Sequence, residues 1–308
     1  MGKVAFVFPG QGSQKVGMGR EAHDAWEVAR DTFRAADAAL DESLSKLCFE
    51  GPEAELKLTR NTQPAILAVS VALWRALDMP CDVVAGHSLG EYSAHVAAGT
   101  LPFDDAVRIV RARGEYMQQA VPVGEGAMAA VMGAERELVE RICADVDGDV
   151  EPANYNAPGQ IVVAGTAAAV NAAGAALKEA GARVVPLPVS APFHSRLMRP
   201  AEERLRSHLR EAPFAAPRVP VYVNVDAEPV TAAEAAADAL ERQVSRPVRW
   251  EESVQRMVAD GVTLFVEIGP GRVLAGLIGR IAKGAKRVNV RGPDDLEAAR
   301  EAIGAERA

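Results

Sequence analysis

Ser88 is the residue of this sequence that is best placed to act as a nucleophile. It is the centre of a Gly-x-Ser-x-Gly motif at residues 86–90, which follows a short apolar segment and precedes a predicted helix over 91–98. A strand, a tight turn and a helix in that order expose a serine hydroxyl. The next backbone N–H, that of Leu89, then points past the hydroxyl from a helix N-terminus and can stabilise an oxyanion. The pattern predicts acyl chemistry, with a tight turn capped by a serine as the alternative.

His194 is the candidate general base among the five histidines. It lies in the loop 190–195, after a predicted strand and downstream of Ser88, and loops at strand ends are where α/β sheets place chemistry. The alternative is a loop histidine paired to backbone. The side chain of His87 should project away from the Ser88 hydroxyl, and the other three histidines are expected to be structural or exposed (His23, His95 and His208). No Asp or Glu before His194 is a convincing third member of a triad, so either a dyad operates or a carbonyl oxygen orients the imidazole.

Arg113 falls on the apolar stripe of the helix predicted over 103–120, together with Met117, whereas Arg108 and Arg111 fall on the solvated face. A buried guanidinium without a partner is too costly to keep. Arg113 therefore either pairs with an internal carboxylate or binds an anionic ligand, and arginine is well suited to bidentate carboxylate recognition.

Gln11 lies in a glycine-rich loop, residues 9–19, that follows the first predicted strand. The loop is not a dinucleotide fingerprint, because Lys15 stands where a third glycine is needed. It can still present backbone N–H groups or a side-chain amide to an anion. The alternative is that Gln11 faces solvent.

The elements that must position these residues alternate between strand and helix. Strands are predicted over 4–8, 82–85, 127–132, 150–154, 160–164, 183–189, 219–224 and 263–268. Helices are predicted over 64–77, 91–98, 103–120, 135–144, 167–180, 199–211 and 273–283. This alternation indicates an α/β fold with a mostly parallel sheet that is covered on both faces. The βαββαβ order within 125–191 is typical of a ferredoxin-like subdomain, inserted into a core formed by 1–124 and 192–308.

Composition excludes several classes of protein. The chain has 308 residues and a net charge of −8, which argues against a general nucleic-acid binder. It lacks an apolar run of about 18 residues, so no membrane span is predicted. The three cysteines have neither zinc nor disulfide spacing, which indicates the reducing cytoplasm. No metal or redox cofactor is expected.

Six sequence blocks resemble the malonyl-CoA:acyl-carrier-protein transacylases and the related acyltransferase domains of polyketide synthases. They stand in the order seen in that family, over nearly the whole chain, at residues 8–14, 86–92, 113–114, 154–160, 193–195 and 267–271. The resemblance implies a hydrolase-like α/β core with an inserted ferredoxin-like subdomain. It also implies transfer of a malonyl group from malonyl-CoA to the phosphopantetheine thiol of an acyl carrier protein. Such a reaction supplies extender units for fatty-acid or polyketide synthesis.

The resemblance assigns the steps of a ping-pong cycle to residues of this sequence. Ser88 attacks the thioester to form a malonyl ester, and His194 passes the proton to the leaving CoA thiolate. The N–H groups of Gln11 and Leu89 form the oxyanion hole. The backbone carbonyl of Gln243 orients His194, which explains the missing acid.

Three further residues are expected to bind the acyl group. Arg113 holds the malonyl carboxylate, and Met117 and Phe193 are expected in the substrate pocket. Phe193 resembles the ring that crowds out an α-methyl group in malonyl-selecting polyketide enzymes. One methyl group discriminates by only about 1–3 kcal/mol, so we expect preference for malonyl groups and not exclusion of others.

The expected partners are malonyl-CoA and an acyl carrier protein, with CoA as a substrate and not a cofactor. Carrier proteins are acidic, so a local basic surface must attract them. Part of the stretch 268–293 is predicted to do so, because it has six basic residues and no acids (Arg272, Arg280, Lys283, Lys286, Arg287 and Arg291). A solvated helix face is the alternative. No oligomer interface is evident, so a monomer is expected.

Two other functions compete with transfer to a carrier protein. A serine hydrolase or thioesterase would use the same nucleophile and base with water as acceptor. The lack of a triad acid and the buried cation argue against it. A catalytically silent, carrier-binding subunit is disfavoured because Ser88, His194 and Arg113 are all present.

Overall fold

A computed structural model of the protein describes residues 2–189 and 191–308. Ser190, the first residue of the loop that was expected to carry the general base, lies outside the described residues. No helix in the described part of the chain is long and apolar enough to cross a membrane.

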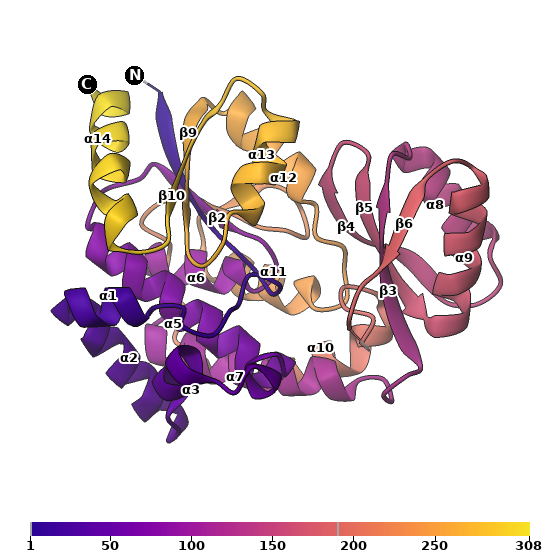
Figure 1. Ribbon diagram of the computed structural model, residues 1–308, viewed down its shortest axis with the longest axis horizontal. Coiled ribbons are helices and arrows are strands. Elements are labelled where there is room, and N and C mark those ends of the chain that lie inside the picture. The colour runs from indigo at the N-terminus through magenta and orange to yellow at the C-terminus, as the bar shows by residue number, and fades with distance from the viewer. Residues whose placement is uncertain (1, 190) are drawn as a thin grey trace.

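The larger of two sheets forms the centre of the core (Figure 1). Its order is β10-β9-β1-β2-β7-β8, and every neighbouring pair is parallel except β7 with β8. The strands are β1 (Lys3–Phe8), β2 (Val83–Gly86), β7 (Val221–Tyr222), β8 (Pro229–Val230), β9 (Val262–Ile268) and β10 (Lys286–Val290).

Helices cover both faces of this sheet, which is why β1 is a continuous apolar run. Alternate β1 side chains point to opposite faces, so Val4 packs with α5 and α14 on one side, and Ala5 packs with α12 and α13 on the other. The helices of the core are α1 (Arg20–Ala25), α2 (Glu27–Leu40), α3 (Leu44–Glu50), α4 (Glu53–Leu56), α5 (Thr59–Leu77), α6 (Gly90–Ala97), α7 (Phe103–Gln119), α10 (Arg199–Glu211), α11 (Ala233–Gln243), α12 (Trp250–Ala259), α13 (Val273–Ile281) and α14 (Leu296–Arg307).

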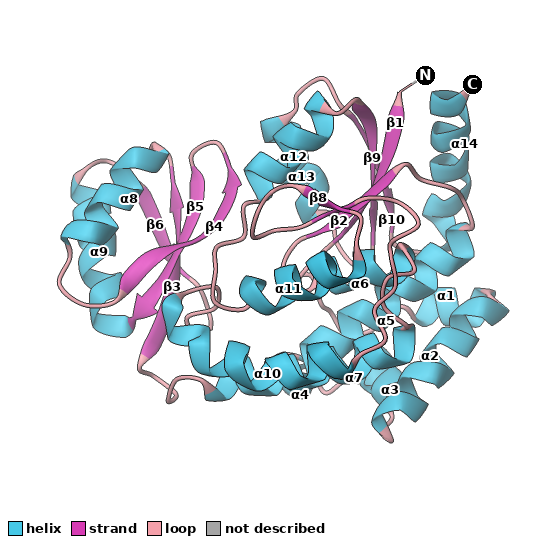
Figure 2. Cartoon of the chain, turned by 180° about the vertical axis from the view of Figure 1, so that it is seen from behind, coloured by secondary structure: helices cyan, strands magenta, loops and turns pink. Residues whose placement is uncertain are grey.

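The second sheet is antiparallel and lies to one side of the core (Figure 2). Its strands, in the spatial order β4-β5-β3-β6, are β3 (Gly126–Met132), β4 (Val150–Ala157), β5 (Gln160–Thr166) and β6 (Arg183–Pro186). Two helices, α8 (Arg136–Asp145) and α9 (Ala167–Glu179), pack on it. This is the connectivity of a ferredoxin-like fold, so the predicted fold class, an α/β core with a small subdomain, is confirmed.

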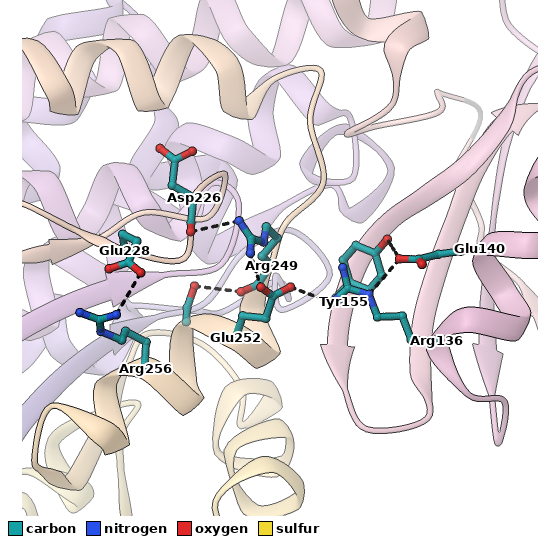
Figure 3. Close-up of polar contacts among 9 residues, drawn as sticks. Arg136, Glu140, Tyr155, Asp226, Glu228, Arg249, Glu252 and Arg256 are labelled. Carbon is teal, nitrogen blue, oxygen red and sulfur yellow. Dashed lines mark hydrogen bonds and ion pairs between the residues drawn. The ribbon is translucent and has the colours of Figure 1, made fainter.

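Backbone and side-chain contacts join the small sheet to the core. Val248 exchanges backbone hydrogen bonds with β4, donating to Ala153 and accepting from Tyr155, both at 2.9 Å. Beside them, Arg136 of α8 forms ion pairs at 2.8 Å with Glu140 of its own helix and with Glu252 of α12 (Figure 3). The small sheet is therefore attached to the core by a short strand-like ladder and a polar cluster.

Some predicted elements differ from the observed ones. The strand expected over 183–189 ends at Pro186, and the strand expected over 219–224 has only two residues, Val221–Tyr222. The second ends early because the backbone N–H of Asn224 donates to a buried glutamate side chain instead of a neighbouring strand. The helix expected from residue 64 begins at Thr59. The edge strand β10 was not predicted, because its start is exposed and basic and resembles a surface segment.

Candidate active site

Ser88 lies in a strained turn between β2 and α6. Its φ angle is 52°, in the left-handed region that is unfavourable for residues other than glycine. The chain can approach itself here only because both flanking positions are glycine. A Cβ atom on Gly86 would lie 1.9 Å from the carbonyl carbon of Gly90, and one on Gly90 would lie 2.0 Å from the carbonyl oxygen of Phe8. The motif therefore builds the predicted exposed nucleophile turn.

His194 is within hydrogen-bonding distance of the Ser88 hydroxyl. Its Nε2 lies 2.6 Å from Ser88 Oγ, and its Nδ1 lies 2.9 Å from the backbone carbonyl oxygen of Gln243. Because a carbonyl can only accept, Nδ1 carries the proton and Nε2 is free to accept one. Burial, followed by the charge of Arg113, lowers the pKa of His194 to about 3, so the imidazole is neutral. Of the two alternatives left by the sequence, the geometry matches orientation by a carbonyl.

Arg113 is buried beside this pair and has neutral partners. Its Nη1 donates to Gln63 Oε1 at 2.8 Å, and its Nη2 donates to Gln243 Oε1 at 2.9 Å and to Ser88 Oγ at 3.2 Å. Among the described residues no carboxylate lies within 4.0 Å of the guanidinium. The Tyr92 ring packs near the guanidinium, with its centroid 5.5 Å away. A cation held this way is ready to receive an anion next to the nucleophile.

A cavity of about 390 Å³ opens onto these groups. Both proposed oxyanion-hole residues, Gln11 and Leu89, line it, and so do both proposed pocket side chains, Met117 and Phe193. Gln11 is half-buried, and its side-chain amide donates to Thr59 Oγ1 at 3.3 Å. The chain thus brings the predicted residues from distant segments to one place, with Gln243 directly behind Ser88 and Arg113.

Three polar residues of the site were not predicted. Asn224 accepts from the Ser88 backbone N–H at 2.6 Å and donates to the Gly86 carbonyl at 2.7 Å, so it clamps the nucleophile turn. Glu91 accepts from the Asn224 backbone N–H at 2.8 Å and from Gln243 Nε2 at 2.9 Å. Gln63 holds Arg113 from the other side. Only the position of Glu91, directly after the Gly-x-Ser-x-Gly motif, offered a sequence signal.

The remaining histidines play no direct part in the pair. His87 points away from the hydroxyl, as predicted, and its Nε2 lies 2.8 Å from Asn156 Oδ1 in the small subdomain. His95 is fully buried, and His208 contacts the Tyr116 hydroxyl at 2.9 Å. His23 is half-buried and close to Asp24.

The prediction for Arg111 was wrong. Its side chain is only 13% exposed, because it forms contacts of 2.7 Å with both Glu42 and Asn61. The helical-wheel position of a residue does not show which neighbouring segments cover it. Arg108 is exposed as predicted and pairs with Asp105 at 3.0 Å.

Within residues 2–189 and 191–308, no group of three or more His, Cys, Asp or Glu side chains could hold a metal ion. The chemistry that the described side chains support is covalent acyl transfer through Ser88.

Comparison with known proteins agrees with this chemistry. A model of the acyl transferase domain matches residues 5–292. The chain belongs to the acyl transferase family. It is 47% identical to the malonyl CoA-acyl carrier protein transacylase of Bacillus subtilis, over 97% of this chain and 96% of that one.

Solved structures of other transacylases are also similar to this chain. An acyl carrier protein S-malonyltransferase from Vibrio cholerae has a TM-score of 0.94 and 48% identity, covering 96% of this chain and 99% of its own. A malonyl-transacylase solved in complex with its type II polyketide synthase acyl-carrier protein has a TM-score of 0.95 and 45% identity, with 97% and 99% covered.

Proposed function

We propose that this protein is an [acyl-carrier-protein] S-malonyltransferase, which moves a malonyl group from malonyl-CoA to the phosphopantetheine thiol of an acyl carrier protein. The observation that carries the proposal is the position of Arg113. It places a buried cation with neutral partners 3.2 Å from the Ser88 hydroxyl, where a carboxyacyl group on that hydroxyl would meet it. Malonyl-CoA presents such a carboxylate, whereas acetyl-CoA does not.

Ser88 and His194 carry the first half of the proposed reaction. His194 Nε2 accepts the Ser88 proton as Oγ attacks the thioester carbon, and the backbone N–H groups of Gln11 and Leu89 stabilise the oxyanion. When the carbon–sulfur bond breaks, His194 returns the proton to the CoA sulfur. The carrier-protein thiol then repeats these steps on the malonyl ester, so the enzyme ends unchanged.

The pocket side chains fit the proposed acyl group in size and polarity. Phe193 and Met117 present apolar surface, while Arg113 supplies the charge. This combination favours a short acyl chain that ends in a carboxylate. We also propose that the enzyme prefers malonyl groups to α-methylated acyl groups, because the ring of Phe193 leaves little room beside the α-carbon.

The carrier protein is proposed to dock over the active-site end of the large sheet. Of the six basic residues in 268–293, Arg272 lies at that end, because α13 begins there and Gly271 packs near Ser13 of the loop that carries Gln11. Lys286 and Arg287 begin β10 and so lie at the opposite end of the parallel strands. Of the predicted basic stretch, we therefore propose that the part around Arg272, and not the part around Lys286 and Arg287, attracts the carrier protein.

Three broader expectations belong to the same proposal. The domain division places 1–124 and 192–308 in the core and 125–191 in the small subdomain, in line with the two separate sheets. We also propose a monomer that works in the cytoplasm, where the free cysteines of this chain would stay reduced. No resident cofactor takes part in the proposed steps.

Initial-rate kinetics with malonyl-CoA and a carrier protein bearing its phosphopantetheine arm test the proposal. Double-reciprocal plots at several carrier concentrations should give parallel lines, and the carrier should gain one malonyl group per CoA released. Release of free malonate at the same rate with or without the carrier would instead identify a hydrolase. CoA release that requires both substrates at once would contradict the seryl-ester route.

A further inference from the structure

Glu91 is a buried acid next to the reaction centre that the proposed chemistry does not use. It lies on α6 and is fully buried. Its Oε2 accepts both of its hydrogen bonds, from the Asn224 backbone N–H and from Gln243 Nε2, while Oε1 has no hydrogen-bond partner among the described residues. A buried carboxylate in a protein is normally paired with a cation or removed from its charged state. Within residues 2–189 and 191–308, no arginine or lysine side chain pairs directly with Glu91 to balance it.

Gln243 connects Glu91 to Arg113. Its side-chain nitrogen donates to Glu91 Oε2 at 2.9 Å and its side-chain oxygen accepts from Arg113 Nη2 at 2.9 Å. The acid on one side and the cation on the other both require the same orientation of this amide. Glu91 and Arg113 thus form a buried pair of opposite charges that is bridged by one neutral amide.

The other groups around Glu91 leave Arg113 as its main counter-charge. His95 of the same helix has its Nε2 4.0 Å from Glu91 Oε1, but burial lowers the pKa of His95 to about 3, so it is neutral. Asp226, on the β7–β8 loop, adds a second negative charge that disfavours the ionised form of Glu91. Asn224 and Gln243 contribute dipoles only. A new anion bound to Arg113 would therefore disfavour the ionised form of Glu91, because two negative charges would then share one guanidinium.

We propose that Glu91 is a positioning residue whose protonation is coupled to the charge of the acyl group, so that it takes up a proton from solvent when a carboxyacyl group binds Arg113. The inference rests on the proposed function. With the site empty or holding a neutral acyl group, ionised Glu91 balances Arg113 and fixes the Gln243 amide. With a malonyl group bound, the malonyl carboxylate takes over the role of counter-charge, and Glu91 becomes neutral.

The acidity of Glu91 suits such a switch. Burial, partly offset by the hydrogen bonds from Gln243 and Asn224, raises its pKa to about 7. A second carboxylate in the same field raises the pKa of Glu91 further. Affinity for a carboxyacyl group is then highest below pH 7 and falls as the pH rises through the pKa of the empty site. If binding raises that pKa by about one unit, affinity falls about tenfold before levelling off.

Calorimetric titration of the Ser88→Ala variant, which binds acyl-CoA without turnover, tests the coupling. Titrations in two buffers of different ionisation enthalpy give the number of protons taken up. At pH 7, malonyl-CoA should bind with an uptake of roughly half a proton more than acetyl-CoA, since the CoA phosphates contribute equally to both. Equal proton uptake with malonyl-CoA and acetyl-CoA would overturn the proposal.

Two glutamate variants assign the proton. In the Ser88→Ala background, Glu91→Gln can keep an oxygen at the position of Oε2 while losing the charge. It should abolish the extra uptake and make the affinities for malonyl-CoA and acetyl-CoA depend on pH in the same way. Glu267→Gln removes another buried acid, one that caps α13, and should preserve the extra uptake and the difference in pH dependence between the two ligands. An extra uptake that persists in Glu91→Gln would contradict the assignment.

The outcome for Glu91 is separable from the outcome for the proposed function. Formation of a malonyl ester on Ser88 in the otherwise unaltered enzyme reports on the function alone. If the ester forms but malonyl-CoA and acetyl-CoA give the same proton uptake, only the role of Glu91 fails. If the Glu91→Gln protein does not fold, the comparison of the two acyl-CoA ligands in Ser88→Ala still decides the question.

Discussion

The guanidinium of Arg113 is the feature that separates this site from a general acyl-ester site. Its three hydrogen-bond partners among the described residues are neutral, and one of them is the nucleophile itself. Replacing it should therefore remove recognition of the acyl carboxylate while leaving the Ser88–His194 pair intact. Charge-assisted hydrogen bonds contribute about 1.5–3 kcal/mol each, so the loss should be large for malonyl groups and small for acetyl groups.

For Arg113→Ala we expect kcat/KM for malonyl-CoA to fall roughly 100-fold or more, and acylation of Ser88 by acetyl-CoA to be retained. Arg108→Ala is a matched control on the same helix, because Arg108 is exposed and its one ion pair among the described residues is with Asp105. Stopped-time assays with both acyl-CoA substrates make the comparison. Parallel losses with malonyl-CoA and acetyl-CoA would mean that Arg113 supports the fold of the site and not the recognition of the carboxylate.

At the scale of elements, the turn between β2 and α6 is held by a residue from the loop that follows the neighbouring strand β7. The Asn224 side chain accepts a hydrogen bond from the Ser88 backbone N–H and donates one to the Gly86 carbonyl. Asn224→Ala leaves both without that partner, and we expect the free energy of unfolding to fall by about 2–4 kcal/mol. Because the turn aims Ser88 at every substrate, kcat should fall by at least about tenfold for malonyl and acetyl groups alike, with little change in KM. Chemical denaturation and single-turnover acylation measure the two effects. An unchanged acylation rate would show that the two glycines alone fix the turn.

The elements that sequence patterns predicted well are those whose pattern is local. The Gly-x-Ser-x-Gly turn, the helix that carries Arg113 and the βαββαβ order each follow from periodicity or turn residues within a short window. The strand at Val221–Tyr222 was predicted too long, because its end is decided by the side chain of Glu91, 133 positions away in sequence. Asn224 and Gln63 were missed for the same reason, since their roles come from partners that only the fold brings near. His194, Arg113 and Gln243 were predicted from loop position, helical phase and family resemblance respectively, and the fold brings all three beside Ser88.

At the scale of the whole molecule, the proposed docking surface is tested by exchanging one exposed arginine at each end of the large sheet. Arg272→Glu should raise the KM for the carrier protein several-fold without changing loading from malonyl-CoA, and the effect should weaken with added salt. Arg287→Glu is the matched control, because Arg287 lies near the start of β10, at the end of the large sheet that is farther from the active site. If Arg287→Glu raised the carrier KM and Arg272→Glu did not, the carrier protein would approach from the other side.

Acid sensitivity of the whole fold is expected from His95. Its folded pKa of about 3 lies below its ordinary value near 6.5, because burial disfavours the charged form. The unfolded chain therefore binds the proton more readily, and the stability contributed by neutral His95 is full above pH 6.5 and is lost as the pH falls toward 3. At pH 5 the loss is about 2 kcal/mol.

We expect urea denaturation to show that, between pH 7.5 and 5, the unaltered protein loses about 2 kcal/mol more stability than His95→Gln. The comparison cancels the opposite contribution of Glu91, whose raised pKa favours the folded state as the pH falls toward 4.5. Equal losses in the two proteins would show that His95 does not stay neutral in the folded state.

Intact-protein mass spectrometry tests the central claim most directly. The enzyme is incubated briefly with malonyl-CoA or acetyl-CoA and then mixed with a carrier protein that bears its phosphopantetheine arm, with Ser88→Ala as the control. The account predicts a malonyl adduct that maps to Ser88, is much weaker with acetyl-CoA, is absent in Ser88→Ala, and disappears only when the carrier protein is added. An adduct that decays equally fast in buffer, or one that persists in Ser88→Ala, would contradict it.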